Sequence, residues 1–362
     1  MRLPAAILAV VLLSPALHAE ERSAFAELAA RGDVAATLDF KLQDYNEAVK
    51  NWKEADGKTA RGLVYERIAL ICSAMGAFEQ AEAAIKSALA DNPNSVSAYF
   101  TLARIHTIRG KCGEAIGVLN EGMRLIPPER RAPFIYQRAM SRLSCSKDEK
   151  QAEADFAEAA ALAPKAGQTD VVRKSKTQLA QLYCRQRQYR KARQAFGEAG
   201  LLAKKPADYD YLLESAKCNL LKGDDNAAMS NYTAYTERAV AMLDEAEKKK
   251  ARAAIDPDIK RRLPEVYCRR GILHETAGDT DKALKDFDRA ISLELETSRE
   301  EKNTVRIPTG EEGESFDIGQ CYFHRAALYA DEGEKDFAAQ DYQEACKRQY
   351  QPACALLRRM KK

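Results

Sequence analysis

Apolar residues of alternating size recur along this chain, at first with a period of about 34 residues and a closing proline, and this recurrence constrains the fold more than any other feature. The first set is Ala81, Ile85, Ala88 and Pro93, and the corresponding set further along the chain is Ala115, Leu119, Gly122 and Pro127. Offsets of three and four residues place the apolar members of each set on one face of a helix. Proline ends that helix because it cannot donate to the backbone ladder. The small residues therefore predict close contact between two helices, while the large residue fills the space toward the neighbouring unit.

A second apolar stripe lies upstream of each set and is followed by a glycine. It consists of Tyr65, Ile68, Ala69 and Cys72 before Gly76, and of Tyr99, Leu102, Ala103 and His106 before Gly110. These offsets again place the residues on one helix face, and glycine supplies the permissive backbone that a tight turn needs. Each period therefore predicts two helices joined by a short turn.

This pattern resembles the tetratricopeptide repeat, in which each unit of roughly 34 residues forms two antiparallel helices that touch through small side chains. Further units are marked by Ala152, Phe156, Ala159 and Pro164; by Ala192, Phe196 and Ala199; by Gly223, Ala228 and Tyr232; by Gly271, Gly278, Ala283, Phe287 and Ala290; and by Tyr322, Ala326, Gly333, Ala338, Tyr342 and Ala345. Tyr45 and Ala48, with Trp52 and Ala55, resemble a degenerate eighth unit. The resemblance implies an all-α fold, a right-handed α-α superhelix (a solenoid) of about seven to eight helical hairpins.

The recurrence also predicts the division of the chain. We expect N-terminal helices with a degenerate repeat over 20–61, units one to four over 62–206, the fifth unit over 207–262, the sixth over 263–297, a charged loop over 298–318, and a Sel1-like seventh unit with a capping helix over 319–362. Residues that favour helix are predicted to extend the second helix of the fifth unit to about Ala254. The charged surface of this extension is either an ordinary solvated face or a docking arm. The loop has proline, glycine and no helical period, and either carries function or is simply disordered.

The first nineteen residues predict a signal peptide, 1–19. Arg2 precedes a short apolar run that ends before Pro15, and Ala19 is a small residue at the expected cleavage point. A buried N-terminal helix is the alternative interpretation. After cleavage, no segment is long and apolar enough to span a bilayer, so no integral membrane segment is expected. The protein is therefore predicted to be periplasmic or secreted.

Composition and motifs argue against several function classes. The formal net charge of +3 is close to balance, so general attraction to nucleic acid is not expected. No two of the four histidines lie four residues apart, no cysteines form a C-x-x-C motif, and no serine lies in a nucleophile elbow. The sequence therefore predicts no enzymatic activity, no cofactor and no metal site.

Nine cysteines in a chain predicted to be exported favour disulfides, and the odd count leaves one over. The segment around Cys346 and Cys354 resembles the Sel1-like repeats of cysteine-rich bacterial secreted proteins. In that family, cysteines at this spacing bridge the end of one helix to the start of the next. The resemblance implies a Cys346–Cys354 bond.

The repeat register predicts two further pairs. Cys184 and Cys218 take positions 12 and 10 of consecutive units, and Cys268 and Cys321 take positions 5 and 3. Two residues turn a helix by about 200°, so one cysteine can point forward to the next unit while the other points back. The same offset occurs twice, which favours Cys184–Cys218 and Cys268–Cys321.

Three cysteines remain. Cys112 lies in the turn of the second unit and Cys145 near the end of the first helix of the third unit, so Cys112–Cys145 is the fourth predicted pair. Cys72 takes a core position and is predicted to be a buried free thiol. For every pair, the alternative is two reduced cysteines that fill small gaps in the core.

The resemblance also implies a concave groove lined by the first helix of each unit. The groove positions carry more basic than acidic residues, and those expected to contact a ligand are Arg67, Phe100, Arg104, Gln137, Arg138, Lys174, Gln178, Gln181, Arg185, Lys217, Arg269 and His324. Arginine suits bidentate binding of carboxylates, and scattered apolar residues anchor peptides. We therefore expect an acidic peptide or protein segment as ligand, with an ordinary solvated surface as the alternative.

The predicted function is an exported scaffold for protein–protein interaction. The alternatives are a structural subunit of an envelope or secretion assembly and a secreted Sel1-like enzyme.

Overall fold

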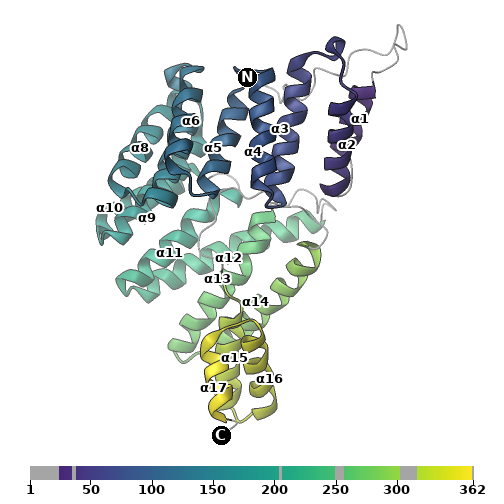
Figure 1. Cartoon of the computed structure of the whole chain (residues 1–362). Coiled ribbons are helices and arrows are strands. Elements are labelled where there is room, and N and C mark those ends of the chain that lie inside the picture. Colours follow the sequence, from purple (N-terminus) through teal and green to yellow (C-terminus); the bar gives the residue numbers. More distant parts are fainter. Residues whose placement is uncertain (1–23, 35–37, 204–205, 249–256, 302–315, 361–362) are drawn as a thin grey trace.

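The described residues of the computed structural model, 24–34, 38–203, 206–248, 257–301 and 316–360, are helical throughout and contain no strand (Figure 1). The helices pair as hairpins: α1 (Ala24–Val34) with α2 (Leu38–Lys50), α3 (Lys58–Ala74) with α4 (Phe78–Asp91), α5 (Val96–Ile108) with α6 (Cys112–Arg124), α7 (Ala132–Ser141) with α8 (Glu149–Leu162), α9 (Thr169–Arg185) with α10 (Tyr189–Leu202), α11 (Asp210–Lys222) with α12 (Asp225–Lys248), α13 (Pro257–Thr276) with α14 (Thr280–Glu301), and α15 (Gly319–Asp331) with α16 (Lys335–Lys347), before a last helix α17 (Gln351–Met360). The predicted all-α solenoid is confirmed.

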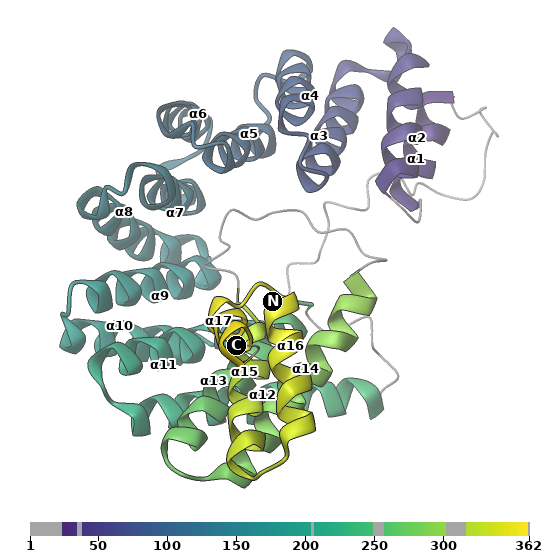
Figure 2. The ribbon, with the colours of Figure 1, turned by 60° about the horizontal axis from the view of Figure 1, so that its bottom comes forward.

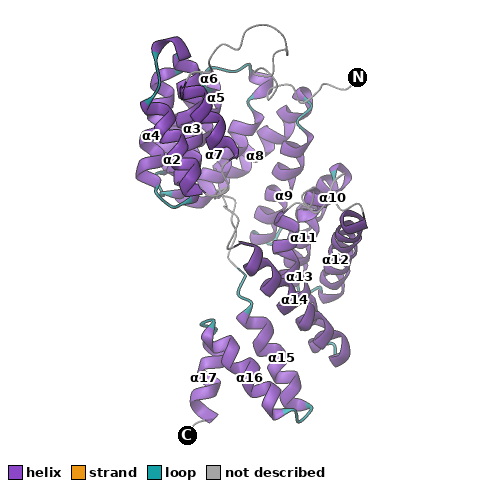
Figure 3. Cartoon of the chain, turned by 90° about the vertical axis from the view of Figure 1, so that its right-hand side faces the viewer, coloured by secondary structure: helices purple, strands orange, loops and turns teal. Residues whose placement is uncertain are grey.

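The hairpins stack side by side along a curved path. Figure 2 looks onto this curve and shows α3, α5, α7 and α9 on its inner side, with α4, α6, α8 and α10 outside. Figure 3, from the side, shows that successive hairpins advance along the molecule toward α17. The first helix of each hairpin therefore lines the concave face.

Small residues occupy the points where helices touch, as predicted. Ala81 and Ala88 of α4 are completely buried, as is Ile85 between them. In the sixth unit, the ring of Phe287 covers Gly271 so closely that a Cβ atom at Gly271 would lie 2.7 Å from the ring. A side chain larger than glycine would push these two helices apart.

A buried ion pair joins the two helices in three of the hairpins. An arginine of the first helix donates two hydrogen bonds to an aspartate of the second: Arg138 to Asp155 (2.9 and 2.8 Å), Arg270 to Asp286 (2.7 and 2.6 Å) and Arg325 to Asp341 (2.7 and 2.8 Å). Each aspartate is at most 5% exposed and directly precedes the large aromatic core residue of its helix. A buried carboxylate requires such a partner, so these pairs fix how the two helices face each other.

The helices of the fifth and sixth units differ from the predicted boundaries. Helix α12 is extended as expected and is described to Lys248; its predicted end near Ala254 lies outside the described residues. The boundary between 207–262 and 263–297 is wrong, because α13 begins at Pro257. Ile259, Leu263 and Val266 form one buried stripe at helical spacing, so 257–262 belongs to the first helix of the sixth unit.

Two other predicted segments fall partly or wholly outside the described residues. The predicted loop 298–318 starts too early, because α14 continues to Glu301 through straight-chain residues that favour helix; residues 302–315 lie outside the description. Ile318, at the end of this segment, is already buried in the C-terminal core. The predicted signal peptide, 1–19, also lies outside the described residues.

Two glycine substitutions test the close-approach principle. Gly271→Ala should lower the free energy of unfolding by about 1–3 kcal/mol, because the new methyl group overlaps the buried Phe287 ring. Gly197→Ala, on the exposed face of α10 with nothing within 4 Å of its added Cβ atom, should raise it by up to about 1 kcal/mol. Urea unfolding followed by circular dichroism measures both, and equal stability of the two variants would contradict the close contact.

Candidate binding groove

The candidate groove is the concave face formed by the first helices. All twelve predicted groove residues lie on these helices: Arg67 on α3; Phe100 and Arg104 on α5; Gln137 and Arg138 on α7; Lys174, Gln178, Gln181 and Arg185 on α9; Lys217 on α11; Arg269 on α13; and His324 on α15. Their side chains differ in what they contact, so not all of them are available to a ligand.

Gln137 and Arg138 are not groove ligands, and this part of the prediction is wrong. Gln137 is 3% exposed. The hydroxyl groups of Thr107 and Ser141 lie 2.7 Å apart and are separated by 34 residues, which aligns Gln137 with the buried Ala103 rather than with an exposed position. Arg138 is directed to the outer helices, where it binds Asp155 and donates a 3.0 Å hydrogen bond to Asn120.

Cations near the two ends of the N-terminal half of the groove have acidic partners in the chain. Arg67 Nη1 lies 3.0 Å from Asp33 of α1, and both side chains are more than 40% exposed. Arg185 Nε donates to Glu149 of α8 at 3.1 Å, again between two exposed side chains. These are solvent-exposed ion pairs, which contribute little to stability.

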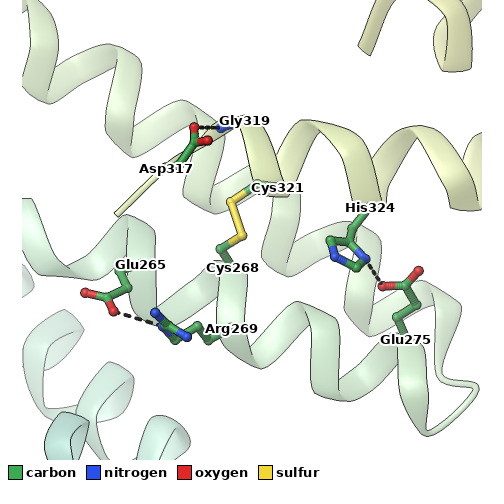
Figure 4. Close-up of a disulfide and its surroundings, with 8 residues drawn as sticks. All are labelled: Glu265, Cys268, Arg269, Glu275, Asp317, Gly319, Cys321 and His324. Atoms are coloured by element: carbon green, nitrogen blue, oxygen red, sulfur yellow. Dashed lines mark hydrogen bonds and ion pairs between the residues drawn. A yellow bond between two sulfur atoms is a disulfide. The ribbon is translucent and has the colours of Figure 1, made fainter. Parts of the chain in front are cut away.

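The C-terminal half contains a chain of charges that crosses from unit to unit. Glu265 of α13 accepts from Arg269 of the same helix at 2.9 Å and lies 3.0 Å from Lys217 Nζ of α11. His324 Nδ1 of α15 lies 2.7 Å from Glu275 at the end of α13. Figure 4 shows Glu265 with Arg269 and Glu275 with His324, on either side of a disulfide. The inner face therefore presents paired charges rather than a bare basic surface.

The remaining predicted groove residues are uncharged or also engaged. Arg104 and Lys174 both have interaction partners. Phe100 packs edge-to-face on Phe134, with ring centroids 5.4 Å apart, and is only half-buried. Gln178 and Gln181 of α9 are half-buried as well. Phe100 and the two glutamines can therefore offer an apolar contact and amide hydrogen bonds to a ligand.

Disulfides join the units on this inner side. The structure contains three of the predicted pairs: Cys184–Cys218 between α9 and α11, Cys268–Cys321 between α13 and α15, and Cys346–Cys354 between α16 and α17, with Cα atoms 5.7, 5.5 and 4.7 Å apart. The first two connect the first helices of consecutive units, and Figure 4 shows the second of them, Cys268–Cys321. They therefore tie together the helices that line the groove.

The other cysteines divide into an untested pair and a free thiol. The predicted pair Cys112–Cys145 stays a prediction, because the side chain of Cys145 lies outside the described residues. Cys72 is a buried free cysteine of α3. Burial raises the pKa of the Cys72 thiol, which keeps it protonated and unreactive at neutral pH.

One cluster in the described residues brings together groups that a metal could use. Glu82, His106 and Glu114 offer ligand atoms within 4.8 Å of one another. Glu82 is already bound by Lys86 at 2.7 Å and by Arg109, and Lys111 lies 3.5 Å from both carboxylates. The hydrogen bond from Lys86 lowers the pKa of Glu82 to about 2, and burial lowers the pKa of His106. The lysine and arginine side chains already neutralise these carboxylates. A metal ion that entered the cluster would therefore have to displace one of these side chains.

Disulfide mapping tests the cysteine assignments. In unreduced, denatured protein treated with an alkylating agent, we expect peptides linked through Cys184–Cys218, Cys268–Cys321 and Cys346–Cys354, with label on Cys72. In folded protein, Cys72 should resist labelling because it is buried. Label on Cys346 or Cys354 before reduction would disprove the C-terminal bond.

The low pKa of Glu82 predicts acid sensitivity. A carboxylate whose pKa is depressed in the folded state stabilises the fold above its unfolded pKa of about 4.3 and loses this contribution as the pH falls toward about 2. Glu82→Gln should therefore be less stable than the wild type at pH 7, and the difference should shrink below pH 4. Urea unfolding across this range, with the exposed Glu121→Gln as control, measures the effect; a difference independent of pH would contradict it.

None of the described helices is long and apolar enough to cross a bilayer.

Comparison with known proteins agrees with the repeat architecture. Residues 264–297 match the tetratricopeptide repeat family model, and no curated protein matches the chain. The solved structures that resemble it include the APC/C hetero-tetramer Cut9–Hcn1 (14% identity, 91% of this chain and 54% of that chain, TM-score 0.51) and the apo form of RapI (13%, 77% and 99%, TM-score 0.50). A tetratricopeptide repeat protein from Parabacteroides merdae shares 15% identity over 77% of this chain and 98% of that chain, with a TM-score of 0.49.

At these identities the structural likeness concerns the fold alone. Together with the stacked hairpins and the repeat motif of the sixth unit, the likeness to the first two structures shows that this chain has the fold of a tetratricopeptide-repeat solenoid.

Proposed function

We propose that this protein is an exported scaffold that binds a protein or peptide partner along the concave face of its solenoid. The observation that carries this proposal is the presence of exposed, paired charges on that face, exemplified by Arg67–Asp33 and Arg185–Glu149. Because the paired groups are on the surface, the pairs are weak and exchangeable. Repeat solenoids use such extended concave surfaces for recognition.

An acidic segment fits this face best. Arg67 and Arg185 keep 45% and 48% of their side chains exposed, so each can accept a ligand carboxylate in place of, or beside, its present partner. Arginine binds a carboxylate with two parallel hydrogen bonds. Phe100, Gln178 and Gln181 lie on the same face of the solenoid and supply apolar and amide contacts for the peptide itself.

Export is supported by the cysteines. Disulfides persist in oxidising compartments and are rare in the cytosol, and the structure pairs cysteines along the solenoid. Together with the predicted signal peptide, this supports a periplasmic or secreted location.

A structural subunit of an envelope or secretion assembly is the second candidate. Helix α12 has 24 residues, whereas the second helices α4 and α6 have 14 and 13. The additional turns extend beyond what the repeat needs and offer a surface for a permanent neighbour. Insolubility or polydispersity of the isolated protein would favour this candidate over a reversible scaffold.

Site-specific crosslinking tests the concave face. A photoreactive amino acid at Gln178 should capture a partner in the exporting cell, whereas the same residue at the exposed Glu121 on outer helix α6 should not. Charge reversal at Arg67 and Arg185 should reduce this capture severalfold. Arg138 is left unchanged in this design because it compensates the buried Asp155. Crosslinking at Glu121 alone, or capture unaffected by charge reversal, would exclude the groove.

A further inference from the structure

A line of exposed arginines marks the outer side of the fourth unit. Arg187 in the turn before α10, and Arg190 and Arg193 on α10, are three residues apart and exposed. In the part of the chain that the structure describes, the side chains of these three arginines form no hydrogen bond or ion pair. Lys191, between them, lies over the ring of Tyr183 at 5.3 Å. Arg193 lies near enough to Asp224 to interact with it electrostatically. The charges of Arg187 and Arg190 are not neutralised by the fold.

The local sequence makes this charge unusual for the molecule. The stretch 185–193 contains five basic residues and no acidic one. Every other second helix from α4 to α16 carries an acidic residue in its first turn, whereas α10 carries none. Cations crowded at the start of a helix repel one another and oppose its dipole. Folding does not favour this arrangement, but an anionic partner would relieve it.

A cavity of about 400 Å³ adjoins the arginines between α10, α11 and α12. Its lining includes Tyr189, Arg193, Phe196, Asn219, Lys222 and Asn231. The nearby acid Asp224 is already engaged, since it pairs with Lys222 at 2.9 Å and accepts a hydrogen bond from the Ala227 amide. The cavity thus combines aromatic rings and amides with two cations and one carboxylate, and its volume is that of a small ligand site.

We propose that Arg187, Arg190 and Arg193 together with this cavity, hereafter the α10 surface, bind an acidic segment of a protein partner. The guanidinium groups engage carboxylates, and the cavity receives a side chain of the same segment. A hollow lined by amides and rings suits a polypeptide better than the flat layer of lipid headgroups, and the net charge of +3 provides no general attraction to polyanions. The α10 surface is on the outer side of the solenoid, so this binding is separate from that proposed for the concave face.

Fluorescence anisotropy with a labelled deca-glutamate peptide tests the proposal on the oxidised full-length protein. In the R67Q/R185Q background, which removes the arginines proposed for the concave face, the additional substitutions R187Q/R190Q/R193Q should weaken binding at least about tenfold, as expected from the loss of three charge contacts. The matched control K282Q/K285Q/R289Q removes three exposed cations of α14 that alternate with Asp281 and Asp288, and should change affinity less than twofold. Deca-glutamine should not bind.

Three further results decide between explanations. The groove variant R67Q/R185Q, which removes the arginines proposed to bind an acidic segment on the concave face, should still bind this peptide through the intact α10 surface. If it does not bind, the α10 surface is not a binding site. The α10 variant should melt no lower than the wild type, because it relieves repulsion; a lower melting temperature would indicate a structural role and overturn the proposal. Tighter arginine-dependent binding of duplex DNA, or of vesicles that contain phosphatidylglycerol mixed with phosphatidylcholine, would overturn the assignment to a protein partner.

Discussion

The fold depends on how closely the two helices of each hairpin approach. At these points one helix presents a small residue and the other a large one, as Gly271 and Phe287 do in the sixth unit. Because the same small and large residues recur in each unit, each hairpin meets the next in a similar geometry, and stacking bends the array into a curve (Figure 2). The concave face is a consequence of this packing and not a separately built site.

Buried charge then decides which side chains are free to bind. Arg138, Arg270 and Arg325 are each committed to an aspartate beneath the surface, since a buried carboxylate without a partner would be strongly destabilising. These arginines belong to the structure. The exposed pairs of the inner face differ from them in kind, because water competes for both members and a ligand can replace one at small cost.

This difference explains how much the sequence could predict. The solenoid and three of the cysteine pairs depend on spacing along the chain, which the sequence states directly. The groove residues depend on contacts between units: Gln137 is polar and lies in a first helix, yet its register relative to Ala103 buries it. The start of α13 cannot be predicted from the prolines, because Pro257 and Pro264 resemble helix boundaries although Ile259, Leu263 and Val266 form one continuous buried stripe. The buried pairs do have a signal in the sequence, because in each of them an arginine of the first helix is matched by an aspartate just before the aromatic core residue of the second.

The disulfides bear on the two surfaces differently. Cys184–Cys218 and Cys268–Cys321 connect neighbouring first helices, so they hold the lining of the concave face at a set spacing and reduce the entropy that a ligand must remove when it binds. Cys218 also lines the α10 cavity. The same bond therefore supports the inner face on one side of α11 and the outer cavity on the other. The two surfaces therefore bind a ligand carboxylate differently. On the inner face, the ligand carboxylate replaces one that already pairs with an arginine. On the α10 surface, it supplies a negative charge that the fold does not place beside Arg187 and Arg190.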